Sequence, residues 1–266
     1  MAKPMTKNYT LGRGKVYFAP FLPGTQTPGA ERYMGNTPDL SWSAEVENLD
    51  HYNADMGIRE KDDSVPLQVD RTGSMSTDNI SMENLALFWF GSSDLVTVTA
   101  ATSATSTLEA VSLAGEYQLG MSAASPAGMR NLSNVSLVLD PGGTDTALVL
   151  GTDYTLDAER GRVEFLEGGA ITGSGTEVVE ATFDVAGQTF PRVVSGNAPI
   201  EGALRFVAFN PKGENIDYYM PWVKLTPDGD YSLKGDDWQT MTLAIEILKK
   251  TGYEAVYADG AATLIP

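Results

Sequence analysis

Two segments with alternating apolar and polar residues flank residues 49–63, which read LDHYNADMGIREKDD. Alternation with a period of two is typical of strands that bury one face, so both segments are predicted to be half-buried strands. Their apolar positions are Leu40, Trp42, Ala44 and Val46 on one side, and Val65, Leu67 and Val69 on the other. The joining stretch is longer than the roughly 2–5 residues of an ordinary hairpin loop, and long ordered connections usually have a function. Residues 49–63 are therefore predicted to be a long hairpin connection that reaches a neighbouring subunit.

This connection carries both signs of charge and two apolar residues with no obvious place in a core. Charged side chains can fix the register of an interface while apolar side chains supply buried area. We expect the connection to become ordered on assembly, because alone it has few contacts to offset its conformational entropy. A flexible surface loop is the alternative interpretation. The candidate contact residues are Asp50, His51, Tyr52, Asp55, Met56, Ile58, Arg59, Glu60, Lys61 and Asp62.

The chain is acidic, with 35 acidic residues, 18 basic residues and a net charge of −17. Proteins that bind DNA tightly neutralise its phosphates with Lys and Arg, so this composition argues against a DNA-binding protein. An acidic surface is still useful beside DNA, because it repels phosphates and lets the polymer slide past. The simpler interpretation, that acidity keeps an abundant protein soluble, stays open.

The chain has no cysteine, which fits synthesis in a reducing cytoplasm and excludes disulfides and thiolate metal sites. Its apolar runs are shorter than the roughly 18 residues of a membrane-spanning helix, so no membrane segment is expected. The N-terminal sequence MAKPMTK is basic but lacks the apolar stretch of a signal peptide. With 266 residues, of which 42% are hydrophobic, the chain can form one large or two ordinary domains.

The middle of the chain differs in composition from its two ends. Ser, Thr and Ala dominate residues 92–107, which are predicted to be a linker or an extended edge. Residues 105–190 hold twelve acids, three arginines and no lysine, a net charge of −9. Short alternating stretches between Gly, Pro and Asp turns predict a small β-sandwich there. The predicted organisation is one domain made of residues 1–104 and 187–266, with residues 105–186 inserted as a second domain.

One helix is predicted shortly after the second alternating segment. Ser81 or Asp78 can cap its N-terminus, and Gly91 can end it. Its apolar residues are spaced three and four positions apart and are expected to pack on a sheet. They are Leu85, Phe88 and Trp89.

Strands are predicted again near the C-terminus, at residues 204–209, 218–225 and 240–248. In the last of these, the apolar residues alternate strictly, a period that excludes an amphipathic helix. They are Met241, Leu243, Ile245 and Ile247.

The sequence offers little for catalysis. His51 is the only histidine, so a Ser/His/Asp triad would have to use it, and a triad needs its base held rigidly in a pocket. Because His51 lies in the predicted surface hairpin, no catalytic residue is predicted and the protein is not expected to be an enzyme. Acid pairs could supply oxygen ligands for calcium, but they lack EF-hand spacing, so no metal is predicted. The pairs are Asp228 with Asp230, Asp236 with Asp237, and Asp140 with Asp145.

Two remaining features have plain structural interpretations. The sequence Gly12-x-Gly14 lacks the third glycine of a nucleotide-binding loop and is interpreted as the start of a strand, so no cofactor is predicted. Three tryptophans, Trp42, Trp89 and Trp222, lie in apolar patterns that predict core packing, whereas the role of Trp238 stays open.

An ordered series of short motifs covers both ends of the chain and leaves out the middle. The motifs are GRGKVYF at residues 12–18, LDHY at 49–52 with GIREKD at 57–62, DNI at 78–80 leading into ENLAL at 83–87, PWVKLTPDG at 221–229 and DDWQ at 236–239. Together they resemble the major tail (tail tube) proteins of long-tailed bacteriophages. The middle of the chain resembles Ig-like insertions found in phage tail proteins, around residues 151–163.

The resemblance implies a mainly β fold: a tail-tube β-sandwich or barrel with one flanking helix, a long stacking hairpin and a small inserted Ig-like β-sandwich. It implies a structural virion protein that forms rings, usually hexameric, which stack into the tube through which DNA leaves the virion. The expected partners are further copies of the chain, a tape measure protein, and tail tip and terminator proteins. DNA would pass through without specific binding, and no membrane would be involved.

The same resemblance implies manufacture in the host cytoplasm and a final location in the phage tail. The candidate residues in 49–63 would then make the contact between stacked rings, and the inserted domain would decorate the outside of the tube. The alternative function is a secreted or surface β-sandwich that binds glycans or cell surfaces, and the missing signal peptide argues against it.

Overall fold

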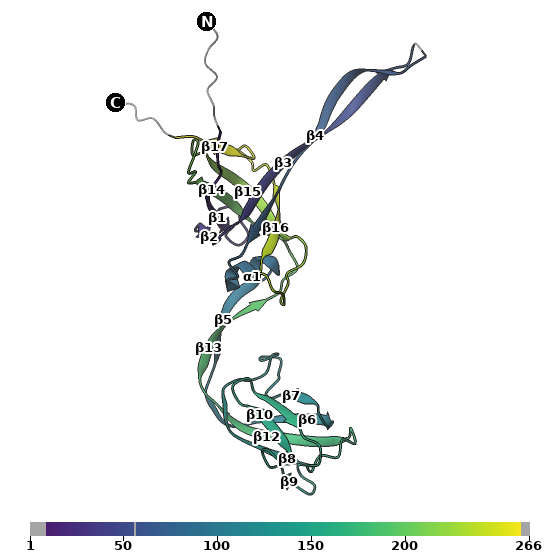
Figure 1. Cartoon of the computed structure of the whole chain (residues 1–266), viewed down its shortest axis with the longest axis vertical. Helices are drawn as coiled ribbons and strands as arrows, with labels where there is room; N and C mark the ends of the chain where they lie inside the picture. The colour runs from purple at the N-terminus through teal and green to yellow at the C-terminus, as the bar shows by residue number, and fades with distance from the viewer. Residues whose placement is uncertain (1–8, 56, 262–266) are drawn as a thin grey trace, which may run out of the picture. The chain divides into compact units, whose positions relative to one another are not determined.

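The computed structural model describes residues 9–55 and 57–261 (Figure 1). These residues form seventeen strands and one helix, so the chain is mainly β, as the sequence predicts. They separate into two compact units: unit 1 holds the described residues up to Asp94 and from Arg192 onward, and unit 2 is Leu95–Pro191. None of the described helical residues forms a helix long and apolar enough to cross a membrane.

Unit 1 is built on one antiparallel sheet, ordered β2-β1-β14-β15-β16-β4-β3, with β17 paired to β15. Its strands are β1 (Gly14–Pro20), β2 (Arg32–Tyr33), β3 (Asp39–Asn53), β4 (Glu60–Thr77), β14 (Ile200–Ala208), β15 (Asp217–Pro227), β16 (Met241–Ile247) and β17 (Tyr257–Asp259). The two halves of the unit interlock, because β1 pairs with β14 and β4 pairs with β16. Neither half can complete the sheet alone.

The core of unit 1 follows the alternation in the sequence. All four alternating apolar residues of β16 are buried, which confirms the strand predicted at residues 240–248. They meet buried residues of β15 such as Val223 and Leu225, together with Met34 and Phe18. Gly14 opens β1, as the interpretation of Gly12-x-Gly14 predicts.

The single helix, α1 (Met82–Phe88), is capped by Ser81, whose Oγ accepts a hydrogen bond of 3.2 Å from the backbone amide of Asn84. Phe88 is buried and Leu85 packs against the core, as predicted, but Trp89 is 50% exposed. The prediction for Trp89 is wrong because the helix ends at Phe88. The chain turns at Phe90, which has a left-handed φ of 53°, so Trp89 leaves the apolar stripe.

Unit 2 contains two sheets around a core of its own. The four-stranded sheet has the order β6-β12-β8-β9 and the three-stranded sheet the order β10-β11-β7. The strands are β6 (Ala101–Val111), β7 (Glu116–Gln118), β8 (Leu132–Leu139), β9 (Thr146–Ala147), β10 (Tyr154–Asp157), β11 (Arg162–Phe165) and β12 (Glu177–Val185). Phe165 from one sheet and Phe183 from the other belong to the same buried cluster, so unit 2 is a small β-sandwich.

The chain passes between the units in two strands, β5 (Ser92–Val98) and β13 (Gln188–Val194), which pair as a two-stranded sheet. The unit boundaries fall at residues 94/95 and 191/192, whereas the composition of the sequence predicts them at 104/105 and 186/187. The first difference arises because the Ser/Thr-rich residues 101–107 belong to β6, an edge strand that pairs with β12. An exposed edge strand needs no apolar alternation, so its sequence is similar to that of a linker.

Candidate assembly interface

The candidate interface is the hairpin formed by β3 and β4, strands of 15 and 18 residues. Their pairing runs from Asp39 opposite Ser76 to Asn53 opposite Glu60. Only the part of β4 from Thr72 onward also pairs with β16, so the rest of the hairpin extends past the body of unit 1 (Figure 1). Beyond that point the outer edges of both strands are free for backbone pairing within the described part of the chain.

The hairpin is longer and its loop shorter than the sequence predicts. Residues 49–63 are predicted as a connection, but β3 continues to Asn53 and β4 begins at Glu60, so the turn spans only residues 54–59. The Asn53 Oδ1 accepts a hydrogen bond of 2.9 Å from the amide of Asp55, which starts the turn. Met56, one of the candidate residues, lies outside the described residues.

The base of the hairpin is fixed by Trp42 and Gly73, which lie directly opposite each other. A Cβ on Gly73 would lie 2.6 Å from Cε3 of Trp42, so the indole ring packs where only glycine leaves room. Trp42 and Leu40 are half-buried against the unit 1 core, which confirms the core packing predicted for Trp42. This contact anchors the base of the hairpin, whose other end has no second layer among residues 9–55 and 57–261.

Above this base, the apolar residues of the hairpin are exposed. Val46 lies opposite Val69, with exposures of 51% and 44%, and Leu49 lies opposite Val65, with exposures of 62% and 51%. Both segments are predicted as half-buried strands, and for these residues the prediction is wrong in the isolated chain. The alternation is real, but no other layer of the described residues of unit 1 covers it, since the apolar residues packed on the core from this hairpin are Leu40, Trp42 and Met75.

Two charged contacts cross the hairpin near its tip. The Lys61 ammonium lies 2.6 Å from Asp50 Oδ1, and the Ser64 hydroxyl donates a hydrogen bond of 2.7 Å to the same oxygen. The hydrogen bond from Lys61 is the larger cause and that from Ser64 the next, and together they hold the pKa of Asp50 below its ordinary value. Both side chains are partly exposed, so the pair fixes local geometry more than it adds stability.

His51 has a similar cross-strand contact. Its Nδ1 lies 2.5 Å from Asp62 Oδ1, and the two side chains are 71% and 44% exposed. The contact lies on the surface of the ribbon and not in a pocket. Because a catalytic base is held by surrounding protein, this place is suited to an interface contact and not to proton transfer on a bound substrate.

The tip keeps its remaining candidate residues open to solvent. Ile58 is 80% exposed, and Tyr52, Asp55, Arg59 and Glu60 are exposed as well. Arg59 has no ion-pair partner among the described residues, in contrast to Lys61. The tip therefore presents an exposed apolar side chain, Ile58, and an adjacent cation without an ion pair, Arg59, to a binding partner.

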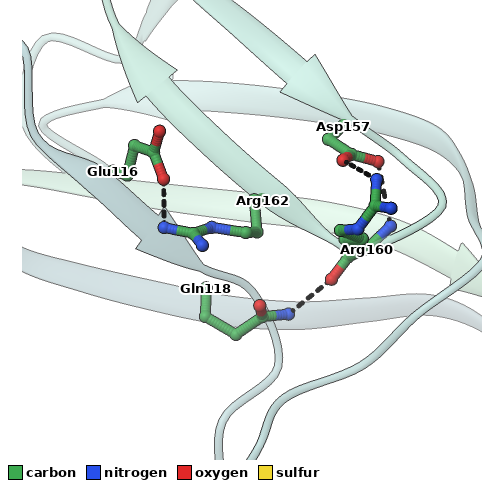
Figure 2. Close-up of polar contacts among 5 residues, drawn as sticks. All are labelled: Glu116, Gln118, Asp157, Arg160 and Arg162. Atoms are coloured by element: carbon green, nitrogen blue, oxygen red, sulfur yellow. Dashed lines mark hydrogen bonds and ion pairs between the residues drawn. The ribbon is translucent and has the colours of Figure 1, made fainter. Parts of the chain in front are cut away.

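A second polar cluster lies in unit 2 and is drawn in Figure 2. Arg162 pairs with Glu116 across neighbouring strands, and Arg160 donates a hydrogen bond of 2.9 Å to Asp157. Gln118 donates to the Arg160 carbonyl oxygen at 2.9 Å. The hydrogen bonds from Arg160 hold the pKa of Asp157 below its ordinary value. Each cation here already has a carboxylate, so the cluster ties the β10–β11 turn to β7 and leaves no charge free for a ligand.

Of the acid pairs considered for calcium, Asp140 and Asp145 accept hydrogen bonds within a turn. Asp140 accepts a hydrogen bond from the Thr144 amide and Asp145 one from the Gly142 amide, which closes the loop between them. Among residues 9–55 and 57–261, no group of three carboxylate or imidazole side chains is placed to hold a metal ion.

The chain was compared with known protein families and with curated proteins. A family described as "protein of unknown function UCP028589" matches residues 9–256. The chain belongs to this family. The matched range includes the whole β3–β4 hairpin and runs through unit 2 as well as unit 1. No curated protein matches the chain. The family description names no activity, so the resemblance to tail tube proteins stays a prediction.

The sequence predicts the candidate contact at the tip of the hairpin, but it does not single out the exposed apolar pairs lower on the hairpin. The missed residues are Val46, Leu49, Val65, Leu67 and Val69, all of them exposed. A signal for four of them is present in the sequence, since Val46 continues the alternation of Leu40 and Trp42, and Val65, Leu67 and Val69 alternate as well, over more residues than the core of one sheet needs. What the alternation cannot tell is whether the covering layer comes from the same chain.

Proposed function

We propose that this chain is the subunit of rings that stack into a hollow tube, the tail tube of a long-tailed bacteriophage, through which DNA passes. The observation that carries the proposal is the β3–β4 hairpin, which extends beyond its own core and exposes paired apolar residues, Val46 with Val69 and Leu49 with Val65. The motif series of the two chain ends supports the same assignment. The fold is then a tail-tube sheet with an inserted Ig-like domain.

Both the side chains and the backbone of the hairpin favour contact with another copy. Burying apolar surface contributes about 25 cal/mol per Å², so exposed valines and leucines favour a partner. A long strand with free edges is also a template for pairing with another chain, and proteins either cover such edges or use them. A ring of identical subunits, such as a hexamer, closes on itself and leaves no free lateral contact. Further rings then stack through the hairpin tips.

The charge pattern fits a conduit for DNA. Glu45 lies directly opposite Asp70, and Glu47 shares their face of the hairpin. Like charges placed opposite each other destabilise a strand pair. If these carboxylates line the channel, they repel the phosphates of DNA, and the DNA can then move past the wall without binding to it.

The proposed partners follow from the tube. Further copies of the chain form the walls, a tape measure protein lies inside, and tail tip and terminator proteins close the two ends. The subunit is made in the host cytoplasm, assembles into the virion tail, and contributes no catalysis.

Electron microscopy of the concentrated, purified protein tests the proposal. Rings or tubes with a stain-filled central channel are expected, and sedimentation velocity should show species far larger than the 28.5 kDa monomer. A protein that remains monomeric at high concentration, without rings, contradicts the proposal.

A glycan-binding or cell-binding surface protein is the second candidate, and Trp238 favours it. This side chain is 93% exposed in the loop between β15 and β16, and exposed indoles can stack on sugar rings. A monomer that binds immobilised glycans and loses binding on Trp238→Ala would support this function over the tube.

A further inference from the structure

A β-bulge in β4 divides the hairpin into two halves. Glu47 lies opposite Gln68, but the next residue, Asn48, lies opposite Pro66. Leu67 is the extra residue, with no residue of β3 directly across from it. An extra residue in one strand shifts the alternation of its side chains relative to the partner strand.

The consequence is seen in the two apolar pairs. Val46 and Leu49 are three positions apart in β3, so their side chains point to opposite faces of the ribbon. Residues directly opposite in a strand pair share a face, so Val69 joins Val46 and Val65 joins Leu49. Val65 and Val69 are four positions apart and would share a face without the bulge.

Each half of the ribbon is amphipathic, but in opposite directions. In the lower half, the face opposite Val46 and Val69 carries Glu47 and Gln68. In the upper half, the face opposite Leu49 and Val65 carries Asp50 and Ser64. A ribbon that lay on one surface would keep its apolar residues on one side and its polar residues on the other.

We propose that the hairpin is held between two surfaces of neighbouring copies of this chain, one on each face, with the bulge at Leu67 as the crossing point. The lower apolar pair, Val46 and Val69, packs on one copy, and the upper pair, Leu49 and Val65, packs on another copy on the opposite side. This inference rests on the proposed tube, and it adds which side chains of the hairpin contact each of the two neighbouring copies.

The charges of the hairpin favour a second copy of the chain as its partner. Arg71 shares the face of Val69 in the lower half, Arg59 lies at the tip, and neither has an ion-pair partner among the described residues. Carboxylates on a partner would pair with these two arginines. The hairpin of a second copy supplies them, because residues 39–77 hold nine acids and only three basic residues.

The absence of cysteine makes a direct test possible. Four variants each carry one thiol: Val69→Cys and Val65→Cys on the two apolar faces, and Gln68→Cys and Ser64→Cys as matched controls on the polar faces beside them. The rate of labelling by a small thiol reagent is measured for each variant as a monomer and as an assembled tube.

Assembly is expected to slow labelling by about tenfold or more at Val69→Cys and at Val65→Cys, because a buried thiol reacts only when the contact opens. Labelling at Gln68→Cys and Ser64→Cys is expected to slow much less. Tubes in which only one apolar position is protected would overturn the inference and leave the proposed function intact. Equal protection of all four positions would overturn it too, because the hairpin would then be enclosed on every side. A parent protein that forms no tube would overturn both.

Discussion

Val46 lies directly opposite Val69 in a hairpin that extends beyond its own core, and both side chains are about half exposed. A pair of β-branched residues in this position adds little to the stability of an isolated chain. The pair contributes to stability when a layer from another subunit covers it and removes its apolar surface from water. The first prediction therefore separates folding from assembly at this pair.

The double substitution Val46→Thr with Val69→Thr keeps the shape and strand preference of both residues and adds two hydroxyls. Because both sites are open in the monomer, its free energy of unfolding should change by less than about 1 kcal/mol. Assembly should weaken by tenfold or more, because each hydroxyl buried without a partner costs about 1–3 kcal/mol. The control Val223→Thr, at a fully buried core site, should show the reverse: a loss of stability in urea unfolding. Unchanged assembly by sedimentation of the double variant would contradict the prediction.

The second prediction concerns the pKa of Asp50. Lys61 and Ser64 hold this pKa below its ordinary value, so the contact stabilises the hairpin above the ordinary pKa and is lost as pH falls through the lowered one. Lys61→Met should raise the pKa of Asp50 toward its ordinary value, and Ser64→Ala should raise it less, since Lys61 is the larger cause. A carbon-detected NMR titration of the Asp50 carboxyl group in each protein measures this. Equal midpoints in wild type and Lys61→Met would show that the pair does not persist in solution.

The third prediction tests the cap of α1. Ser81→Ala removes the acceptor of the Asn84 amide and should lower the free energy of unfolding by about 0.5–2 kcal/mol. Ser81→Asp should retain most of the stability, because its carboxylate can accept the same hydrogen bond. Urea unfolding followed by tryptophan fluorescence measures both. A neutral effect of Ser81→Ala would mean that the helix is held by packing alone.

The fourth prediction concerns unit 2. Each unit has its own core, and a Cβ on Gly187 would lie 3.9 Å from the Val98 carbonyl oxygen, so the two ends of the excised segment are near each other. A chain in which residues 99–187 are replaced by an Asn-Gly turn should fold and still form tubes, because strands β5 and β13 can be joined as an ordinary hairpin. Circular dichroism and electron microscopy measure the two outcomes. Loss of the fold would show that unit 1 needs unit 2.

Where burial imposes a pattern, the sequence predicts the structure well. The alternation of β16, the Ser81 cap and the strand composition of unit 2 all reflect contacts inside the chain. Residues 101–107 of the edge strand β6 lie in the stretch predicted to be a linker, because an edge strand with exposed side chains has no apolar period.

The hairpin shows the limit of sequence reasoning most clearly. Residues 49–63 are rich in charged side chains, and all of those that the structure describes except Asp50 are exposed, so nothing in their pattern separates a strand from a loop. Val65, Leu67 and Val69 alternate as if they shared one face, and only the register with β3 reveals that the bulge sends Val65 and Val69 to opposite sides. Backbone register depends on the partner strand, which a pattern within one strand cannot encode.

The most direct test of the account is whether the hairpin tip carries the contact that polymerises the protein. The variant Ile58→Asp with Arg59→Glu removes the exposed apolar side chain and reverses the free cation. The matched control, Leu233→Asp with Lys234→Glu, makes the same two changes at another exposed apolar–basic pair, in the loop between β15 and β16. Sedimentation velocity of both variants beside wild type is the deciding measurement. The account predicts a folded hairpin variant that does not form tubes and a control that polymerises as wild type does. Wild-type tube formation by the hairpin variant would contradict it.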